Sequence, residues 1–388
     1  KDDMVKNFAY LLYIKFSNIK SKLYNNFISS SKCINLKGAV YDNGRIIKAD
    51  SFEMYLTDVD FYLYLESYNF DYEIVEAYYS VYNYLPLKYI NFILDKYVIK
   101  TEYKNVEGKE IEYNLEKQKF NALYGMTVTN NIKDEVVFEN NIWSEVELTN
   151  DEIEEKLKDE EKKGFLSFSY GVWVTAWARK NLLMNVIKLD KYVVYCDTDS
   201  IKLVQGYDKN ILAHYNETVK NRINFVSKKL GIDISRFAPK DKKGNMHMLG
   251  LFEYEKEDYQ DYSYKEFITQ GAKKYAVKEV VQDKETKELS DKIKITVAGV
   301  PKKGAKVLKD LKDFQDGLIF RFKDTNKNLL VYADNQEEFI LTDYLGNKQK
   351  VKDKSGCCLL PNSYTLGKAL DYAYLLSDDS SKRSIYKE

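Results

Sequence analysis

The sequence is poor in the residues that usually build metal centres. It has two histidines, His214 and His247, and four cysteines among its 388 residues. The cysteines show no CxxC spacing; they are Cys33, Cys196, Cys357 and Cys358. A structural zinc site and a disulfide framework are therefore not expected, and the composition suits a reducing cytosol.

An excess of one charge is also missing, since 60 basic residues balance 60 acidic ones. This disfavours a protein that coats nucleic acid without selectivity, although a local basic groove would still suit a DNA enzyme. No apolar run reaches the length of a membrane span, and no signal peptide opens the chain at Lys1. We therefore expect no membrane association, and we expect a cytoplasmic protein that stays in the compartment where it is made.

The length of the chain favours two or three subdomains over one compact core. Alternating stretches at residues 10–16 and 46–55 predict strands, with a turn at residues 42–44. Residues 85–103 predict a helix with a stripe of Tyr89, Phe92, Ile93 and Tyr97. A turn ending at Gly108 and a second helix over residues 111–124, ended by Gly125, complete an αα-hairpin.

The rest of the chain alternates helices and short strands. An acidic insertion is expected at residues 126–165 and a buried helix at 165–188. Strands at residues 192–196 and 201–204 follow, and the last hundred residues predict short strands and a helix over 365–376. We therefore predict an α+β fold with separate subdomains.

Two acids mark the turn between the strands at 192–196 and 201–204, in the string Tyr195-Cys-Asp-Thr-Asp-Ser200. In an extended backbone residues two apart share a face, so Asp197 and Asp199 are expected to point the same way. Carboxylates about 4–5 Å apart repel by roughly 3–4 kcal/mol at an effective dielectric near 20. Such a pair suits Mg²⁺ or Mn²⁺, although a solvated turn of Asp, Thr and Ser produces the same pattern.

A polar stripe lies on the predicted helix over residues 111–124. Lys117, Asn121 and Tyr124 are spaced i, i+4 and i+7, and Lys100 could reach the same groove from the preceding helix. A cation, an amide and an aromatic ring suit a nucleoside triphosphate. An amphipathic surface helix has the same pattern.

A third pattern, Lys273-Lys274-Tyr275, places cations beside an aromatic ring. Such a pair can hold a backbone phosphate while the ring contacts a sugar. Short strings of this kind also arise by chance in a chain rich in lysine and tyrosine.

The order of the three patterns resembles motif B, motif C and the primer-holding motif of family B DNA polymerases. They read KxxxNxxYG, YxDTDS and KxY. Other stretches resemble the protein-primed branch of phages and linear plasmids. They are Thr57-Asp-Val-Asp60, Asp95-Lys96 through Lys100-Thr101, Thr175-Ala-Trp-Ala-Arg179 and Val297-Ala-Gly299.

The resemblance implies a right-hand polymerase: a palm of antiparallel sheet plus helices, helical-hairpin fingers, family-specific insertions and a small thumb. Its expected parts are an insertion between palm and fingers (1–85), fingers (86–125), a second insertion (126–165), palm with motif C (166–290) and thumb (291–388).

The resemblance also implies the role of each residue. Asp197 and Asp199 would be catalytic and bind two Mg²⁺ ions, with Mn²⁺ as a substitute. Lys100, Lys117, Asn121 and Tyr124 would bind the incoming dNTP, and Lys273 and Tyr275 the primer terminus. The implied reaction is nucleotidyl transfer to a primer hydroxyl in DNA replication, with template-primer DNA and a terminal priming protein as partners.

The sequence departs from this pattern in three places. Motif A is expected before residue 1, and the look-alike at Asp60–Tyr64 lacks the proline that should follow. No exonuclease domain is found, and Ala122 replaces a usual serine. A truncated portion of the enzyme is therefore expected, and two alternatives stay open: an impaired remnant that only binds DNA or a partner, and a metal-dependent nuclease.

Overall fold

The computed structural model describes residues 8–42, 44–129, 132, 135–139, 142–163, 167–255, 264–282, 288–321, 330–334, 338–342, 348–352, 357–361 and 364–366. The chain divides into two compact units. Unit 1 comprises residues 1–129, 165–254 and 371–388, and unit 2 comprises residues 130–164 and 255–370. Helices and antiparallel sheets occur in separate regions of the chain, which confirms the predicted α+β class.

Unit 1 contains one large antiparallel sheet. Its strand order is β2 (Ile34–Lys37), β4 (Arg45–Thr57), β1 (Phe8–Ser21) and β5 (Tyr68–Val81), and β3 (Val40–Asp42) pairs with β4. Over residues 12–16 of β1 and 52–56 of β4, alternate residues face a core built from apolar side chains. Cross-strand pairs such as Ile14 with Met54 and Phe16 with Phe52 form this core. The alternation predicted at residues 10–16 and 46–55 therefore marks real strands.

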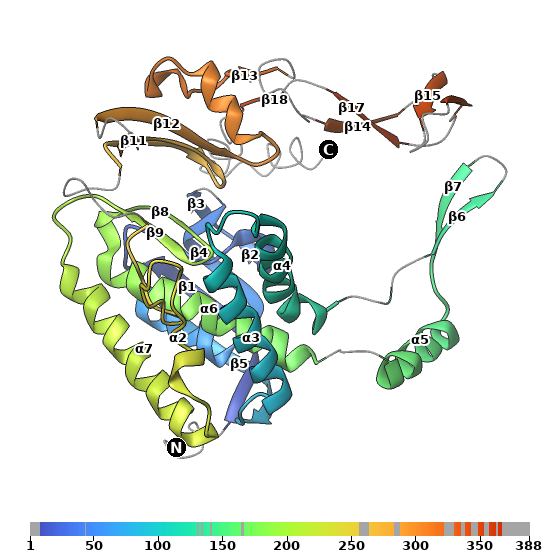
Figure 1. The fold of residues 1–388 in the computed structure, drawn as a ribbon. Helices are drawn as coiled ribbons and strands as arrows, with labels where there is room; N and C mark the ends of the chain where they lie inside the picture. The colour runs from blue at the N-terminus through green and yellow to red at the C-terminus, as the bar shows by residue number, and fades with distance from the viewer. Residues whose placement is uncertain are drawn as a thin grey trace. The chain divides into compact units, whose positions relative to one another are not determined.

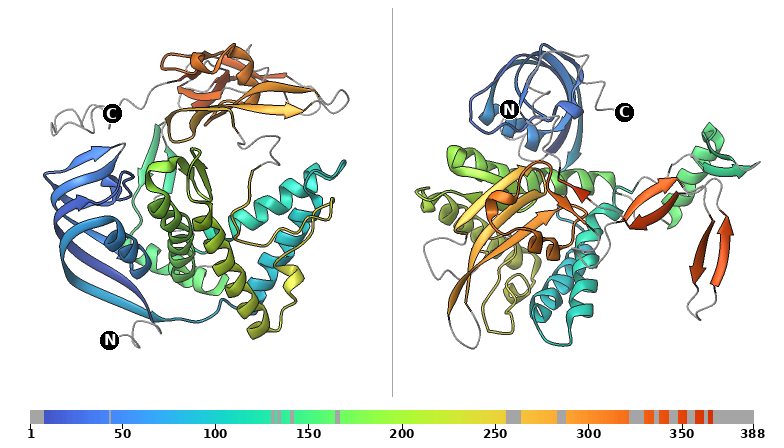
Figure 2. Two further views of the ribbon diagram at one scale, coloured as in Figure 1. Left: turned by 90° about the vertical axis from the view of Figure 1, so that its left-hand side faces the viewer. Right: turned by 90° about the horizontal axis from the view of Figure 1, so that it is seen from above.

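Two helices pack against this sheet, and a third packs on one of them (Figures 1 and 2). Helix α2 (Asp58–Ser67) follows β4 directly, and the Thr57 side chain caps it by accepting from the Asp60 N–H. Helix α6 (Phe168–Leu189) contacts α2 on one side and α7 (Lys209–Leu230) on another. Among the helices that the structure describes, none is both long and apolar enough to cross a membrane.

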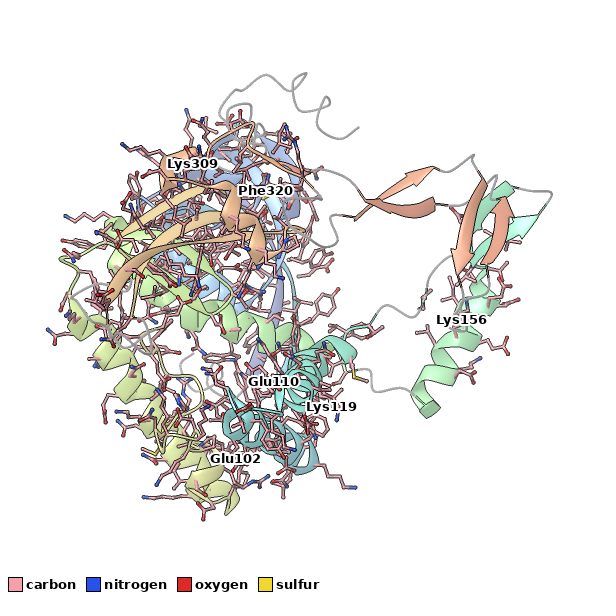
Figure 3. All side chains as sticks on the ribbon, turned by 45° about the horizontal axis from the view of Figure 1, so that its top comes forward. Glu102, Glu110, Lys119, Lys156, Lys309 and Phe320 are labelled. Atoms are coloured by element: carbon pink, nitrogen blue, oxygen red, sulfur yellow. The ribbon has the colours of Figure 1, made fainter. Side chains whose placement is uncertain are left out.

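The predicted αα-hairpin is present as α3 (Leu87–Tyr103) and α4 (Glu110–Met126). Lys96 and Glu116 join the two helices through an ion pair of 2.7 Å. Figure 3 labels Glu102 on α3 and two residues of α4, Glu110 and Lys119.

Two details of the αα-hairpin differ from the prediction. Gly125 lies inside α4, which ends one residue later at Met126. The most buried residue of α3 is Leu94, at 1% exposure, whereas Phe92 of the predicted stripe is exposed.

Leu94 is buried because α3 packs on the segment after α7. Ile232 and Phe237 cover it, and η3 (Ile234–Arg236) lies between them. The Arg236 guanidinium donates to the Asn91 side-chain oxygen at 2.7 Å and to an Asp95 carboxylate oxygen at 2.8 Å. The α3–α4 hairpin is thus anchored at α3 by apolar burial and by one forked cation.

Unit 2 is built on the antiparallel sheet β10 (Glu266–Gly271), β11 (Lys274–Gln282) and β12 (Leu289–Val297). Its core contains Ala276, Phe314 and Phe320, each fully buried, and Figure 3 labels Phe320. Short 3-10 turns, η4 (Lys302–Val307) and η5 (Leu311–Asp313), follow β12. Strand β12 spans the boundary expected at residues 290 and 291.

The remaining described elements of unit 2 are one helix and four strand pairs. They are α5 (Asn150–Lys163), β6 (Glu135–Glu139) with β7 (Ile142–Val146), β13 (Ile319–Phe320) with β18 (Tyr364–Thr365), β14 (Leu330–Asp334) with β17 (Cys357–Pro361), and β15 (Glu338–Thr342) with β16 (Lys348–Lys352). Of the helix predicted over residues 365–376, Thr365 is a strand residue, and residues 367–376 lie outside the described part.

The C-terminal end of α4 meets the first turn of α6 at a glycine. A Cβ on Gly171 would lie 2.2 Å from the Val128 Cγ1 atom and 2.8 Å from the Thr127 Oγ1 atom. The Ser167 N–H also donates to the Thr127 carbonyl at 2.9 Å. Any side chain at position 171 would therefore push α4 away from α6.

We predict that Gly171→Ala lowers the free energy of unfolding by about 1–3 kcal/mol, because the added methyl group overpacks this contact. Urea unfolding followed by circular dichroism measures the change. Gly125→Ala is the matched control, since a Cβ there meets nothing within 4 Å. It should be neutral or stabilise α4 by up to about 1 kcal/mol, and equal effects of the two substitutions would contradict the steric account.

Candidate functional site

The two acids lie at the end of a β-hairpin formed by β8 (Val193–Asp197) and β9 (Ser200–Leu203). The strand stops at Asp197, and Thr198 takes a positive φ of 54° so that the chain can reverse. The Asp199 N–H donates back to the Asp197 carbonyl at 2.6 Å. The hairpin was correctly predicted. Strand alternation does not apply to Asp199, because this residue belongs to the turn, so the expectation that Asp197 and Asp199 point the same way stays a prediction.

The turn is strained at its centre. A positive φ is unusual for a β-branched residue such as Thr198 and costs about 1–3 kcal/mol. The Thr198 hydroxyl donates to the Asp197 carboxylate at 3.0 Å, which stabilises part of this conformation. Asp197 is half-buried, while Asp199 is exposed.

Helix α6 supports the hairpin from below. Leu182, Val186 and Leu189 of α6 form a buried cluster with Val193 at the start of β8. At the end of α6, the Asp190 carboxylate accepts from the backbone N–H groups of Tyr24 and Asn25. The acidic turn therefore projects from a fixed base.

The polar stripe of α4 faces solvent. Lys117 and Asn121 are exposed, and the Tyr124 side chain is 47% exposed. The Lys117 ammonium lies 5.8 Å from the centre of the Tyr113 ring. None of these three side chains is needed to fill the core.

Lys100 lies across the α3–α4 hairpin from this stripe. Its ammonium is half-buried, 5.2 Å from the Phe120 ring centre and 5.7 Å from that of Tyr97. Such placement over two ring faces holds the cation in a defined position.

Electrostatic effects on Lys100 connect the two halves of the candidate site. Burial lowers the pKa of Lys100, and the positive charges of Lys117 and Lys104 lower this pKa further. The negative charge of Asp199 raises the same pKa. Lys100, Lys117 and Asp199 therefore lie close enough for their charges to interact, although they are distant in the chain.

The third predicted pair lies in unit 2. Lys273 occupies the turn between β10 and β11 with a positive φ of 54°. The Tyr275 ring stacks on Phe267, with centres 5.4 Å apart. Lys273 thus lies in the turn of this hairpin, and Tyr275 lies two residues later on β11.

A divalent metal would find two carboxylates in the acidic turn. Within the described residues, no group of three or more His, Cys, Asp or Glu side chains is arranged to hold a metal ion. Mg²⁺ commonly binds one or two carboxylates and completes its shell with substrate phosphates and water. Asp197 and Asp199 fit that pattern if a phosphate ligand is also present.

Asp60, the motif A look-alike, has a structural role. Arg179 of α6 donates to both of its carboxylate oxygens, at 2.9 and 2.8 Å, and the Thr57 hydroxyl donates to one of them at 2.8 Å. Asp60 is 8% exposed. Its oxygens therefore join α2 to α6. This structural role agrees with the sequence analysis, in which the segment lacks the proline of motif A.

Sequence reasoning missed this ion pair and the Arg236 anchor. Both join residues that are more than a hundred positions apart. The sequence did contain a signal for the Asp60–Arg179 ion pair, because both residues belong to stretches that resemble the protein-primed branch. No sequence signal marked Arg236.

Comparison with known proteins finds no family model that matches. The DNA polymerase of Bacillus phage B103 is 25% identical over 207 residues, which is 51% of this chain and 32% of the relative. The DNA polymerase of Bacillus phage Nf is 24% identical over 208 residues, with the same shares. In sequence, the chain thus spans about a third of these relatives.

Two solved structures of phi29 DNA polymerase resemble the fold. A complex with primer-template DNA gives a TM-score of 0.55 at 16% identity and covers 92% of this chain and 50% of that chain. A complex that also holds incoming nucleotide substrates gives 0.54 at 17% identity and covers 92% and 51%. The α+β fold therefore matches about half of that polymerase.

We predict that Lys100→Met leaves the chain equally or more stable at neutral pH, because the charged ammonium is disfavoured by burial and by two neighbouring cations. A folded-state pKa below the unfolded value means that wild-type stability rises with pH through the interval between the two values. The variant should lack this rise. Urea unfolding of both proteins between pH 7 and 10.5, in EDTA, measures the difference, and parallel pH profiles would contradict it.

Proposed function

We propose that the chain, a distant homologue of the protein-primed phi29-type family B DNA polymerases over about half their length, is the polymerase portion of a DNA-directed DNA polymerase. The observation that carries the proposal is the effect of Lys117 and of Asp199 on the pKa of Lys100. A polymerase needs triphosphate-binding cations and metal-binding acids around one nucleotide.

In this proposal Lys100 and Lys117 bind the triphosphate. Asp197 and Asp199 would hold two Mg²⁺ ions, or Mn²⁺, which when bound activate the primer hydroxyl and stabilise the leaving pyrophosphate. The primer 3′-hydroxyl gives its proton to water, and its oxygen forms a bond to the α-phosphorus as the bond to pyrophosphate breaks. Lys117 offsets the negative charge that develops on the phosphates, and Asn121 and Tyr124 line the nascent base pair.

The parts of the chain take matching roles. Residues 86–125 would be fingers, 166–290 palm with motif C, and 291–388 thumb, with insertions at 1–85 and 126–165. Lys273 and Tyr275 would hold the primer terminus. The proposed partners are template-primer DNA, dNTPs and a terminal priming protein, and the proposed place of action is the cytoplasm of a host cell.

A second candidate is a relative that binds nucleotides or DNA without catalysis. It is favoured because, in the described part of the chain, the two carboxylates belong to no group of three or more His, Cys, Asp or Glu side chains that could hold a metal ion. A metal-dependent nuclease is less well supported, because cleavage of DNA does not require the triphosphate-binding cations Lys100 and Lys117.

We predict that Lys117→Ala weakens binding of a fluorescent dATP analogue, in the presence of Mg²⁺ and primer-template DNA, by about 10- to 100-fold. That range corresponds to the loss of one charge-assisted contact worth about 1.5–3 kcal/mol. Fluorescence anisotropy measures the affinity. Lys119→Ala is the matched control, because Lys119 is on the same helix but pairs with Glu116 at 2.8 Å. Equal weakening by the two variants would reject the proposed site.

We also predict that Asp199→Asn removes the dependence of dATP binding on Mg²⁺, because the substitution takes away one carboxylate ligand. A titration of Mg²⁺ at constant nucleotide measures this, and gel-resolved primer extension measures catalysis. Extension by wild type and none by the variant supports the polymerase. Mg²⁺-dependent binding by wild type with no extension supports the non-catalytic candidate.

A further inference from the structure

A cluster of cations and aromatic rings lies on α2, α6 and α7, elements other than the α3–α4 hairpin and the acidic turn. Figure 1 shows these three helices. We define the cation–aromatic patch as Tyr62, Trp177, Lys180 and Arg222. The Lys180 ammonium lies 4.9 Å from the Tyr62 ring centre and 4.7 Å from that of Trp177. The Arg222 guanidinium carbon lies 5.6 Å from the same Trp177 ring.

The two cations of the patch are close enough to repel each other. Burial lowers the pKa of Lys180, and the charge of Arg222 lowers it further, while Asp58 partly offsets this. Asp58 is itself engaged, since it accepts from the Trp173 indole N–H at 3.2 Å. Lys180 and Arg222 make no ion pair with any residue that the structure describes. An anion between them would therefore be stabilised by both.

The aromatic rings indicate which kind of anion would bind best at this patch. Free phosphate would use the cations but would gain nothing from the aromatic faces. A DNA duplex would offer phosphates, but its bases are stacked inside. A single strand offers both a phosphate and an unstacked base, and aromatic rings beside a basic groove are the usual means of binding it. The Tyr62 side chain is 45% exposed and can receive a base.

We propose that the cation–aromatic patch binds single-stranded DNA, with phosphates held by Lys180 and Arg222 and a base stacked on Tyr62. This site requires no catalysis by the chain, so it can be tested even if the proposed polymerase activity fails. The competing view is that the four side chains only join three helices. In that case, substitutions in the patch would change the stability of the fold but not the salt dependence of DNA binding.

The test measures binding of a fluorescein-labelled oligo(dT) of about 12 nucleotides by anisotropy, from 50 to 300 mM NaCl without Mg²⁺. Each phosphate contact in a single strand contributes about 0.7 to the slope of log K against log salt. Lys180→Met with Arg222→Gln should bind more weakly, with a slope shallower by about 1.4. Arg222→Gln alone changes an exposed side chain and should reduce the slope by about 0.7.

The matched control is Lys20→Met with Lys48→Gln. These lysines are also exposed, and they pair across β1 and β4, so the variant removes the same charge from the same unit. It should retain the wild-type slope. Equal slopes for wild type and both patch variants would overturn the proposal, as would equal loss in the control variant or absence of oligo(dT) binding by wild type.

Discussion

The close approach of α4 to α6 at Gly171 is the constraint on which the candidate site depends. It allows the polar stripe of α4 to lie near a helix that also supports the acidic turn through Leu182, Val186 and Leu189. Arg179, on the same helix, fixes α2 through Asp60. One rigid helix thus sets the spacing between elements that are far apart in the chain.

The charges at the candidate site lower the stability of the fold. Lys100 is half-buried among Lys104 and Lys117, and its lowered pKa expresses the cost of keeping that ammonium charged. Thr198 adds a strained backbone between the two acids. A core would be more stable without either feature. Such costs concentrate at functional sites, where a ligand of opposite charge removes them.

Much of this arrangement could be predicted from the sequence. Helical periodicity predicted α3, α4 and α6, and alternation predicted the hairpin of β8 and β9, because these signals come from residues close together in the chain. The packing of Leu94 was missed, since the segment that buries it begins more than a hundred residues later. The turn position of Asp199 was missed because alternation holds only while the backbone stays extended, and Thr198 ends that conformation.

Ion pairs between distant parts of the chain were missed for a related reason. The segment at Asp60 resembled motif A only superficially, and the hydrogen bonds from Arg179 and Thr57 show that its oxygens are occupied. A carboxylate in a sequence has no visible partner. Its chemistry depends on burial and on nearby charges, which tertiary contacts determine.

The lysines and the acids of the site have opposite effects on a bare triphosphate. Lys100 and Lys117 attract its phosphates, whereas Asp197 and Asp199 repel them. A divalent cation between the acids and the phosphates would turn that repulsion into a shared attraction. The two groups can therefore act together on one nucleotide only in the presence of a metal. Under the proposed function, that requirement separates a polymerase site from a surface that simply binds anions.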